Sequence, residues 1–484
     1  MKKYILILVL FATITFGFAY NPTVIIGTAK FAANCDLRIY KYDDLLSYKR
    51  VLVTNTRIDK HGNFRVEIDL NQPSYFMFCI NFIEGDFYAE PEYTYNVELE
   101  ADSKYKNPIE ISAAEVPMYV ICKDSLFKDI NSLINALDNA VGIFLSQNNN
   151  FEKIYFGRNI KTIDSLKSII FDGWGENNGQ YFRTYQKYTF ANVDLIFRSK
   201  MTDTLFKLYI GNNEIYTENS AYMNFFNSFF NNYFDNPFSK FSKLLIQDII
   251  NKEADLFKIS NELGRDPLLA NEIIREIVLI KMLTELYVKE DFNQANIYKL
   301  LTEISKNSKF PEHRKMAANS IYMLHSKINS KMLIDFEFKN VSGVNTKISN
   351  FLGKYIYIQF FTTDCESCIR DMYGINKLKK TYGDSIEFIS ISVDVNSGKL
   401  FQFVNKQIDF NWQILHFNND YDFIDNYQIK GLPYSIFLDK DGQIIANPAL
   451  QPDEDLSKFF EFLLKEGKSN RKYFLPGMSE EKTK

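Results

Sequence analysis

The sequence predicts a multidomain chain with an N-terminal β-sandwich, a middle all-α region and a C-terminal α/β domain. The length of 484 residues allows several cores, and the spacing of apolar residues changes twice along the chain. Short alternating runs give way to helical spacing, which gives way to alternating strands and helices. We expect the three domains at residues 20–111, 112–330 and 331–468, followed by a charged tail at 469–484.

The first residues have the pattern of an export signal. A positive start, Lys2-Lys3, precedes an apolar run that reaches Phe16, and Gly17-Phe18-Ala19 is a small-x-small cleavage site. An uncleaved membrane anchor is the alternative, but the run is shorter than the roughly 20 residues that a spanning helix needs. We therefore expect residues 1–19 to be a removed signal peptide and the mature chain to lie in the periplasm or cell envelope.

The first predicted domain alternates short apolar runs with turn signals. Runs typical of strands begin near Thr23, Leu37, Phe64 and Tyr95, and Asp59-Lys60-His61-Gly62 is a turn. This spacing predicts a small antiparallel sandwich.

The middle region has helical periodicity. Aromatic residues at positions 222, 226, 229 and 233 form one stripe of a helix, and Asp266-Pro267 is an N-cap followed by a first-turn proline. The stripe either belongs to the core or lines a groove for an unfolded client. We favour the core, because most aromatic stripes at this spacing are buried.

A pair of cysteines in the third region is the most informative feature of the chain. The apolar, aromatic and β-branched run from Tyr355 predicts a buried strand that stops at the first cysteine, Cys365, and a helix follows the second, Cys368, from Ile369 to about Lys380. The unpaired N–H groups and the positive dipole end of a helix stabilise a thiolate over a thiol. Two thiols at this spacing can form and break a disulfide by exchange with a partner.

The rest of the third region predicts a mostly parallel or mixed sheet. A central strand covers residues 386–393, a helix 400–406, a hairpin 434–446 and a last helix 456–464. The hairpin is preceded by Gly431-Leu432-Pro433.

These motifs together resemble the thioredoxin fold. More narrowly, residues from about 333 to 464 are similar to the exported TlpA/ResA-type thiol-disulfide oxidoreductases of the bacterial envelope. The segments that match are Asp335–Phe338, Phe351–Lys354, Phe360-Phe361 before the first cysteine, Ile391–Asp394 and Gly431–Gly442. The two earlier domains resemble the sandwich-plus-helices extension of some members.

The resemblance implies a role for each residue of the motif. Cys365 would be the attacking thiolate and Cys368 the resolving thiol. Pro433 would follow a cis peptide bond, and Leu432 would present its backbone to an extended substrate. Asp371 stands where the family usually has a glutamate below the cysteines and is the candidate proton acceptor, with a solvated helix acid as the alternative.

The sequence also departs from the family. Asp364 replaces the tryptophan that usually precedes the first cysteine, so this candidate substrate contact is acidic. Glu366 and Asp371 add two more acids near the pair, and nearby negative charge disfavours a thiolate. Gln359 occupies the position of the buried acid of cytosolic thioredoxins and cannot relay protons.

The implied function is thiol-disulfide exchange with exported proteins, as a reductant fed by a membrane thiol carrier and without a cofactor. A peroxidase is one alternative, because Thr362-x-x-Cys365 resembles the peroxiredoxin motif, although Ile358 stands where that motif has a proline. A non-catalytic docking module is another. We expect no metal site, because His416 is the domain's one histidine and lacks ligand spacing to the cysteines. A net charge of −4 argues against nucleic acid.

Three further cysteines, Cys35, Cys79 and Cys122, precede the pair. Cys35 and Cys79 could form a structural disulfide in an exported protein. We favour the alternative that all three are small buried hydrophobic residues.

Overall fold

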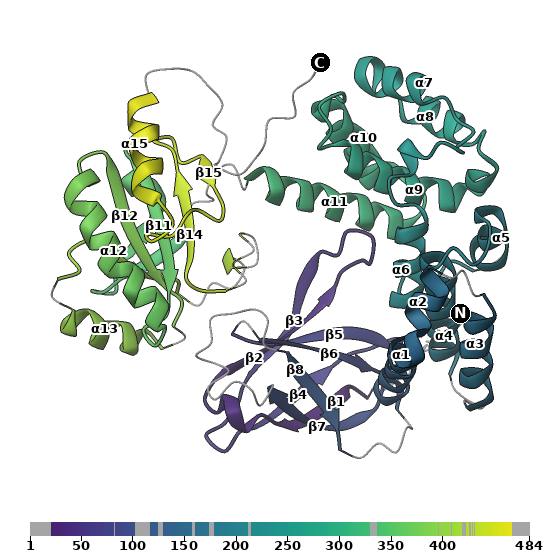
Figure 1. Ribbon diagram of the computed structural model, residues 1–484, viewed down its shortest axis with the longest axis horizontal. Coiled ribbons are helices and arrows are strands. Elements are labelled where there is room, and N and C mark those ends of the chain that lie inside the picture. The colour runs from purple at the N-terminus through teal and green to yellow at the C-terminus, as the bar shows by residue number, and fades with distance from the viewer. Residues whose placement is uncertain are drawn as a thin grey trace, which may run out of the picture.

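The computed structural model describes residues 21–466, apart from gaps at 82, 102–116, 124–128, 157–159, 174–178, 212–213, 330–335, 395, 408, 419–422, 425–426, 428 and 430. The predicted signal peptide and charged tail lie outside the described residues. Figure 1 shows two sheets and a group of helices in the first part of the chain, followed by an α/β domain.

The N-terminal region consists of two four-stranded sheets, ordered β4-β1-β7-β8 and β3-β2-β5-β6. The strands are β1 (Thr23–Thr28), β2 (Asp36–Tyr42), β3 (Arg50–Arg57), β4 (Asn63–Ile68), β5 (Ser74–Ile80), β6 (Ile83–Ala89), β7 (Thr94–Ala101) and β8 (Met118–Cys122). The predicted two-sheet fold is therefore confirmed, with two corrections. β1 pairs with β7 in parallel, so the sandwich is not purely antiparallel. β8 pairs with β7 beyond the predicted boundary at residue 111, so the sheets continue to Cys122.

Alternation along the strands explains why these segments pack as two layers. In β4, Phe64, Val66 and Ile68 are buried while Arg65 and Glu67 between them face solvent. Side chains that alternate across a strand place one apolar row against the opposite sheet. The predicted turn before β4 contains Gly62 with a φ of 85°, a backbone conformation that glycine adopts without strain.

The middle region is helical from Ile130 onward. Its α-helices are α1 (Ile130–Ser146), α2 (Asn150–Tyr155), α3 (Ile160–Gly173), α4 (Gln180–Ile196), α5 (Thr202–Phe206), α6 (Ser220–Phe229), α7 (Lys243–Asp248), α8 (Leu256–Leu263), α9 (Glu272–Leu286), α10 (Gln294–Asn307) and α11 (Pro311–Asn329). Asp266 caps only a short 3-10 turn, Pro267–Leu269, and α9 begins after its own cap, Asn271.

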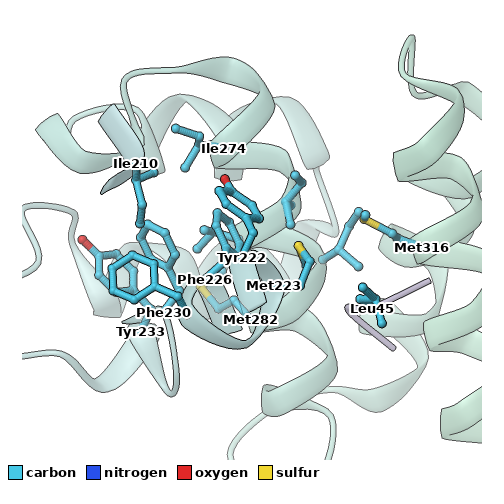
Figure 2. Close-up of a cluster of buried hydrophobic side chains, with 14 of the residues drawn as sticks. Leu45, Ile210, Tyr222, Met223, Phe226, Phe230, Tyr233, Ile274, Met282 and Met316 are labelled. Carbon is cyan, nitrogen blue, oxygen red and sulfur yellow. The ribbon is translucent and has the colours of Figure 1, made fainter. Parts of the chain in front are cut away.

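The predicted aromatic stripe lies in the core of this region. Tyr222 and Phe226 are fully buried, and Figure 2 shows them beside Phe230 and Tyr233 in a cluster of apolar side chains. Phe229 is partly buried against the same cluster and is the last residue of α6, so Tyr233 lies in a separate 3-10 turn (Tyr233–Asp235) and the four residues do not form one continuous helical stripe. They lie in or against the core, as the core interpretation predicts.

The sandwich packs directly on the helices. Leu45, from the loop between β2 and β3, belongs to the helical core (Figure 2), and so does Tyr88 of β6. On α11, the Asn319 side-chain amide donates to the carboxylates of Asp43 (2.7 Å) and Asp44 (2.8 Å). The sandwich therefore keeps its own core between the sheets, and a few of its side chains extend the helical core across the boundary between the two regions.

The C-terminal region has its own core around a seven-stranded mixed sheet, ordered β10-β9-β13-β12-β11-β14-β15. Its strands are β9 (Glu337–Asn340), β10 (Asn345–Lys347), β11 (Tyr355–Phe361), β12 (Ile386–Ser392), β13 (Gln413–His416), β14 (Tyr434–Leu438) and β15 (Ile444–Ala446). Its helices are α12 (Glu366–Tyr382), α13 (Ser397–Lys406) and α15 (Leu456–Glu466) (Figure 1).

Strand direction confirms the predicted α/β arrangement. β11, β12 and β13 run parallel to one another, and the β14–β15 hairpin pairs antiparallel with β11. None of the helices in the described ranges combines the length and the apolar character that crossing a bilayer requires.

Candidate redox site

The cysteine pair lies where the buried central strand joins a helix. All seven residues of β11 are buried, so the strand fixes the position of the loop that follows it. Cys365 is the N-cap of α12, and its Sγ accepts a hydrogen bond from the backbone N–H of Cys368 at 3.2 Å. This is the expected geometry, in which the N-terminus of the helix stabilises negative charge on Sγ.

Cys365 and Cys368 form a disulfide, with an S–S distance of 2.09 Å and a Cα–Cα distance of 5.3 Å. Cys368 is fully buried, whereas Cys365 retains 5% exposure. The Ser367 hydroxyl lies 3.3 Å from the Cys365 Sγ. A partner molecule therefore reaches Cys365 first.

The Leu432–Pro433 peptide bond is cis, as the resemblance implies. In the sheet, Tyr434 at the start of β14 is paired with Phe360 near the end of β11. This register brings Leu432 and Pro433 to the same end of the sheet as the C-terminus of β11, where the cysteine loop begins.

Asp371 lies on α12 three residues after Cys368, which places the two side chains on the same face of the helix. It is only 8% exposed, so the alternative of a solvated helix acid does not describe it. Burial, with a smaller contribution from the negative charge of Asp453, raises the pKa of Asp371 from 3.8 to about 6. A carboxyl group with this pKa can gain or lose a proton near neutral pH.

Asp364 forms an ion pair with Lys399 of α13. Sequence reasoning placed three acids beside the cysteines and missed this cation, because Lys399 lies 35 positions away along the chain. No sequence signal identified it, since the contact depends on where α13 packs.

Asp394 holds the loop in front of the cysteines. Its carboxylate accepts hydrogen bonds from the Thr363 backbone N–H (3.0 and 3.2 Å), from the Thr363 hydroxyl (3.0 Å) and from the Ser392 hydroxyl (2.6 Å). Burial raises the pKa of Asp394. The matching motif Ile391–Asp394 thus has a structural purpose that its sequence alone did not reveal.

His416 supports Asp394 from β13. Its Nε2 lies 2.6 Å from the carbonyl oxygen of Asp394, and its Nδ1 accepts from the Asn418 backbone N–H at 3.0 Å. Because a carbonyl oxygen can only accept, Nε2 carries the proton and the ring is the neutral tautomer. Burial lowers the pKa of His416 in agreement with this assignment.

A buried chain of hydrogen bonds lies beneath the resolving cysteine. The Gln359 amide donates to the carbonyl oxygen of Cys368 at 3.1 Å, and Ser390 donates to the Gln359 side-chain oxygen at 3.3 Å. Trp412 donates in turn to the Ser390 hydroxyl at 2.9 Å. Gln359 therefore fixes the first turn of α12, in place of the acid found at this position in cytosolic thioredoxins.

The three other cysteines are not disulfide-bonded. Cys79 is buried, as expected for a small hydrophobic residue, whereas Cys35 and Cys122 are only partly buried. Burial raises the pKa of Cys35. The alternative disulfide between Cys35 and Cys79 is not formed.

Comparison with known proteins gives matches in the C-terminal region. Residues 330–447 match the AhpC/TSA family. Thiol-disulfide oxidoreductase ResA of Bacillus thuringiensis subsp. konkukian (strain 97-27) is 26% identical over 129 residues, which are 26% of this chain and 73% of the relative. ResA of Bacillus subtilis (strain 168) is 20% identical over 137 residues, covering 28% of this chain and 75% of the relative.

One of the similar solved structures is the thioredoxin domain of a thiol-disulfide oxidoreductase from Bacteroides vulgatus. It is 19% identical, and the match covers 28% of this chain and 96% of that domain with a TM-score of 0.26.

Proposed function

We propose that this chain, whose C-terminal domain is a thioredoxin-like domain of the AhpC/TSA family related to ResA thiol-disulfide oxidoreductases, exchanges its cysteine pair with the thiols and disulfides of exported proteins. The observation that carries the proposal is the disulfide at the N-terminus of α12, in which Cys365 retains some exposure and Cys368 has none. This asymmetry gives the two sulfurs separate roles.

In the reducing direction, the Cys365 thiolate attacks one sulfur of a substrate disulfide. A mixed disulfide forms between Cys365 and that sulfur, and the other substrate sulfur leaves as a thiolate. The Cys368 backbone N–H, which bonds to the Cys365 Sγ, stabilises the attacking thiolate.

Cys368 then resolves the mixed disulfide. Its thiol gives a proton to the Asp371 carboxylate and attacks the Cys365 Sγ, which forms the Cys365–Cys368 disulfide and releases the second substrate thiolate. The substrate gains two electrons, and the protein loses them. A pKa of about 6 leaves most of Asp371 ionised at neutral pH and therefore able to accept this proton.

Leu432 and Pro433 would hold an extended substrate strand beside the pair, and Asp364 would border the same site. We further propose that the protein acts as a reductant in the periplasm or cell envelope, after removal of residues 1–19, and receives electrons from a membrane thiol carrier. The export pattern at the N-terminus and the relation to ResA support this assignment.

Insulin reduction with dithiothreitol tests the exchange reaction. The full chain should accelerate precipitation of the insulin B chain, and Cys365→Ala should abolish the acceleration. Cys79→Ala is the matched control, because Cys79 is a buried thiol outside this domain. Equal rates for the wild type and Cys365→Ala would instead indicate a docking module without exchange activity.

Peroxide reduction is a second candidate, because the Thr362 hydroxyl is buried without a hydrogen-bond partner among the described residues. In that reaction, Cys365 would be oxidised to a sulfenic acid as an alcohol or water leaves, and Cys368 would condense with it to release water. Consumption of hydrogen peroxide by the reduced protein, lost in Thr362→Val, would support this function over protein disulfide exchange.

A further inference from the structure

The ion pair between Lys399 and Asp364 connects α13 to the residue that immediately precedes Cys365. The Lys399 side chain is 50% exposed and the Asp364 side chain is 39% exposed, so burial alone does not hold the pair together. Lys399 lies in the first turn of α13, which begins after its own N-cap, Asn396.

The backbone around Asp364 is held in place from the same direction. Three hydrogen bonds attach Thr363 to Asp394, which follows β12. Asp394 and Lys399 lie within six positions of each other in the segment that leads from β12 into α13. Two consecutive residues before Cys365 are therefore fixed by one segment, which keeps the Asp364 carboxylate within reach of the ammonium group.

Several acidic side chains lie near Cys365, and the ion pair with Lys399 offsets the charge of one of them. Asp364 precedes it, Glu366 and Asp371 lie on its own helix, and Asp394 lies behind the loop. Each negative charge near a cysteine opposes ionisation of its thiol.

Groups from other elements also face the pair of Lys399 and Asp364, because the charge of Lys399 reaches the Cys35 thiol. Burial raises the pKa of that thiol, Arg57 and Lys399 act to lower it, and Asp36 acts to raise it. His416 of β13 packs against Asp394 as a neutral ring. Arg370 acts on Asp371, further along α12. The ammonium group of Lys399 is therefore the cation that the structure pairs with the acid adjacent to Cys365.

We propose that Lys399 is a positioning residue of the redox site, which neutralises Asp364 and thereby keeps the Cys365 thiolate available for exchange. The inference rests on the proposed function and adds an electrostatic control of its nucleophile. The departure from the family at position 364 would thus be compensated by a residue from α13.

Alkylation of the reduced full-length protein tests this proposal. The rate at which iodoacetamide modifies Cys365 is followed against pH by peptide mass spectrometry, so that Cys35, Cys79 and Cys122 do not contribute. Lys399→Met should move the midpoint of the alkylation-rate profile to higher pH and slow alkylation at pH 7 by about three- to tenfold. The reason is that the Asp364 carboxylate then remains beside Cys365 without its cation. Lys406→Met is the matched control on the exposed end of the same helix and should stay within about twofold of the wild type.

A double-variant comparison separates this electrostatic role from a structural one. Asp364→Asn removes the negative charge that Lys399 balances, so Asp364→Asn combined with Lys399→Met should return the rate to within about twofold of the wild type. The reduction potential of Lys399→Met should become more negative, because a destabilised thiolate disfavours the reduced form.

An unchanged alkylation profile in Lys399→Met, or a double variant as slow as Lys399→Met alone, would overturn the proposal. Alkylation needs no protein substrate, so the result is independent of the insulin assay. If the wild type reduces insulin normally and Lys399→Met leaves the alkylation profile unchanged, only the proposed role of Lys399 is refuted. If the wild type does not reduce insulin but the alkylation shifts appear as expected, the exchange function is refuted and the electrostatic role of Lys399 stands.

Discussion

Replacing Asp371 with asparagine should stabilise the C-terminal domain while slowing its reaction. Burial raises the pKa of Asp371 from 3.8 to about 6, so the folded state binds this proton more tightly than the unfolded state does. Stability contributed by the protonated carboxyl is therefore present below pH 3.8 and is lost as the pH rises through about 6. A shift of about two units corresponds to roughly 3 kcal/mol, which solvent screening of a partly hydrated group reduces to about 1 to 2 kcal/mol.

Urea unfolding at pH 4 and pH 8 measures this effect. A Trp174→Phe background leaves Trp412, in the C-terminal domain, as the one tryptophan whose fluorescence reports unfolding. The free energy of unfolding of Asp371→Asn should exceed that of the Trp174→Phe background by about 1 to 2 kcal/mol at pH 8 and by much less at pH 4. Asp384→Asn, which removes an exposed acid from the same domain, should show little difference between the two pH values.

The same variant should lose activity. Without the carboxylate, resolution of the mixed disulfide by Cys368 loses its proton acceptor, and turnover at pH 8 should fall by about a hundredfold or more. A variant that is less stable than its background at pH 8, or that keeps the wild-type rate, would refute the reasoning from burial and proton transfer.

Asp453→Asn removes a negative charge that helps to raise the pKa of Asp371. The acid limb of the insulin-reduction pH profile should therefore move to lower pH, and an unmoved limb would contradict a role for Asp371 in proton transfer. Gln359→Leu removes the side-chain donor to the Cys368 carbonyl oxygen and leaves the buried Ser390 hydroxyl without its acceptor, so it should lower the free energy of unfolding of this domain by about 1 to 3 kcal/mol in urea. No loss would mean that these two hydrogen bonds are dispensable. Asn319→Ala removes the amide that binds Asp43 and Asp44 where the sandwich meets the helices. It should lower the free energy of unfolding by about 1 to 3 kcal/mol, as followed by far-ultraviolet circular dichroism, while an unchanged transition would indicate that apolar packing alone holds the two regions together.

Local patterns were sufficient to predict most elements of the C-terminal domain. The apolar run from Tyr355 predicts a buried strand up to Cys365, and the structure has β11 over Tyr355–Phe361, which ends before the cysteine loop. The helix predicted from Ile369 begins earlier, at Glu366. The cysteines follow directly in sequence, so their position at the start of α12 could be predicted from that pattern and from the capping rules.

Contacts between distant segments could not be predicted in the same way. The pairing of β1 with β7 in parallel and the extension of the sheet to β8 depend on the tertiary arrangement of strands that look alike in sequence. Lys399 and Asp394 reach the cysteine loop only because β12 and α13 fold back beside β11. The acids next to the cysteines were visible in the sequence, and the groups that balance them were not.

The central claim is that Cys365 and Cys368 alternate between a dithiol and a disulfide by exchange. Equilibrating the full chain in glutathione buffers of graded potential, and then trapping free thiols with a maleimide before mass analysis, measures this most directly. We expect both cysteines to lose reactivity together in one two-electron transition, between about −270 and −120 mV. Cysteines that react independently of each other, or that stay unreactive at every potential, would contradict the account.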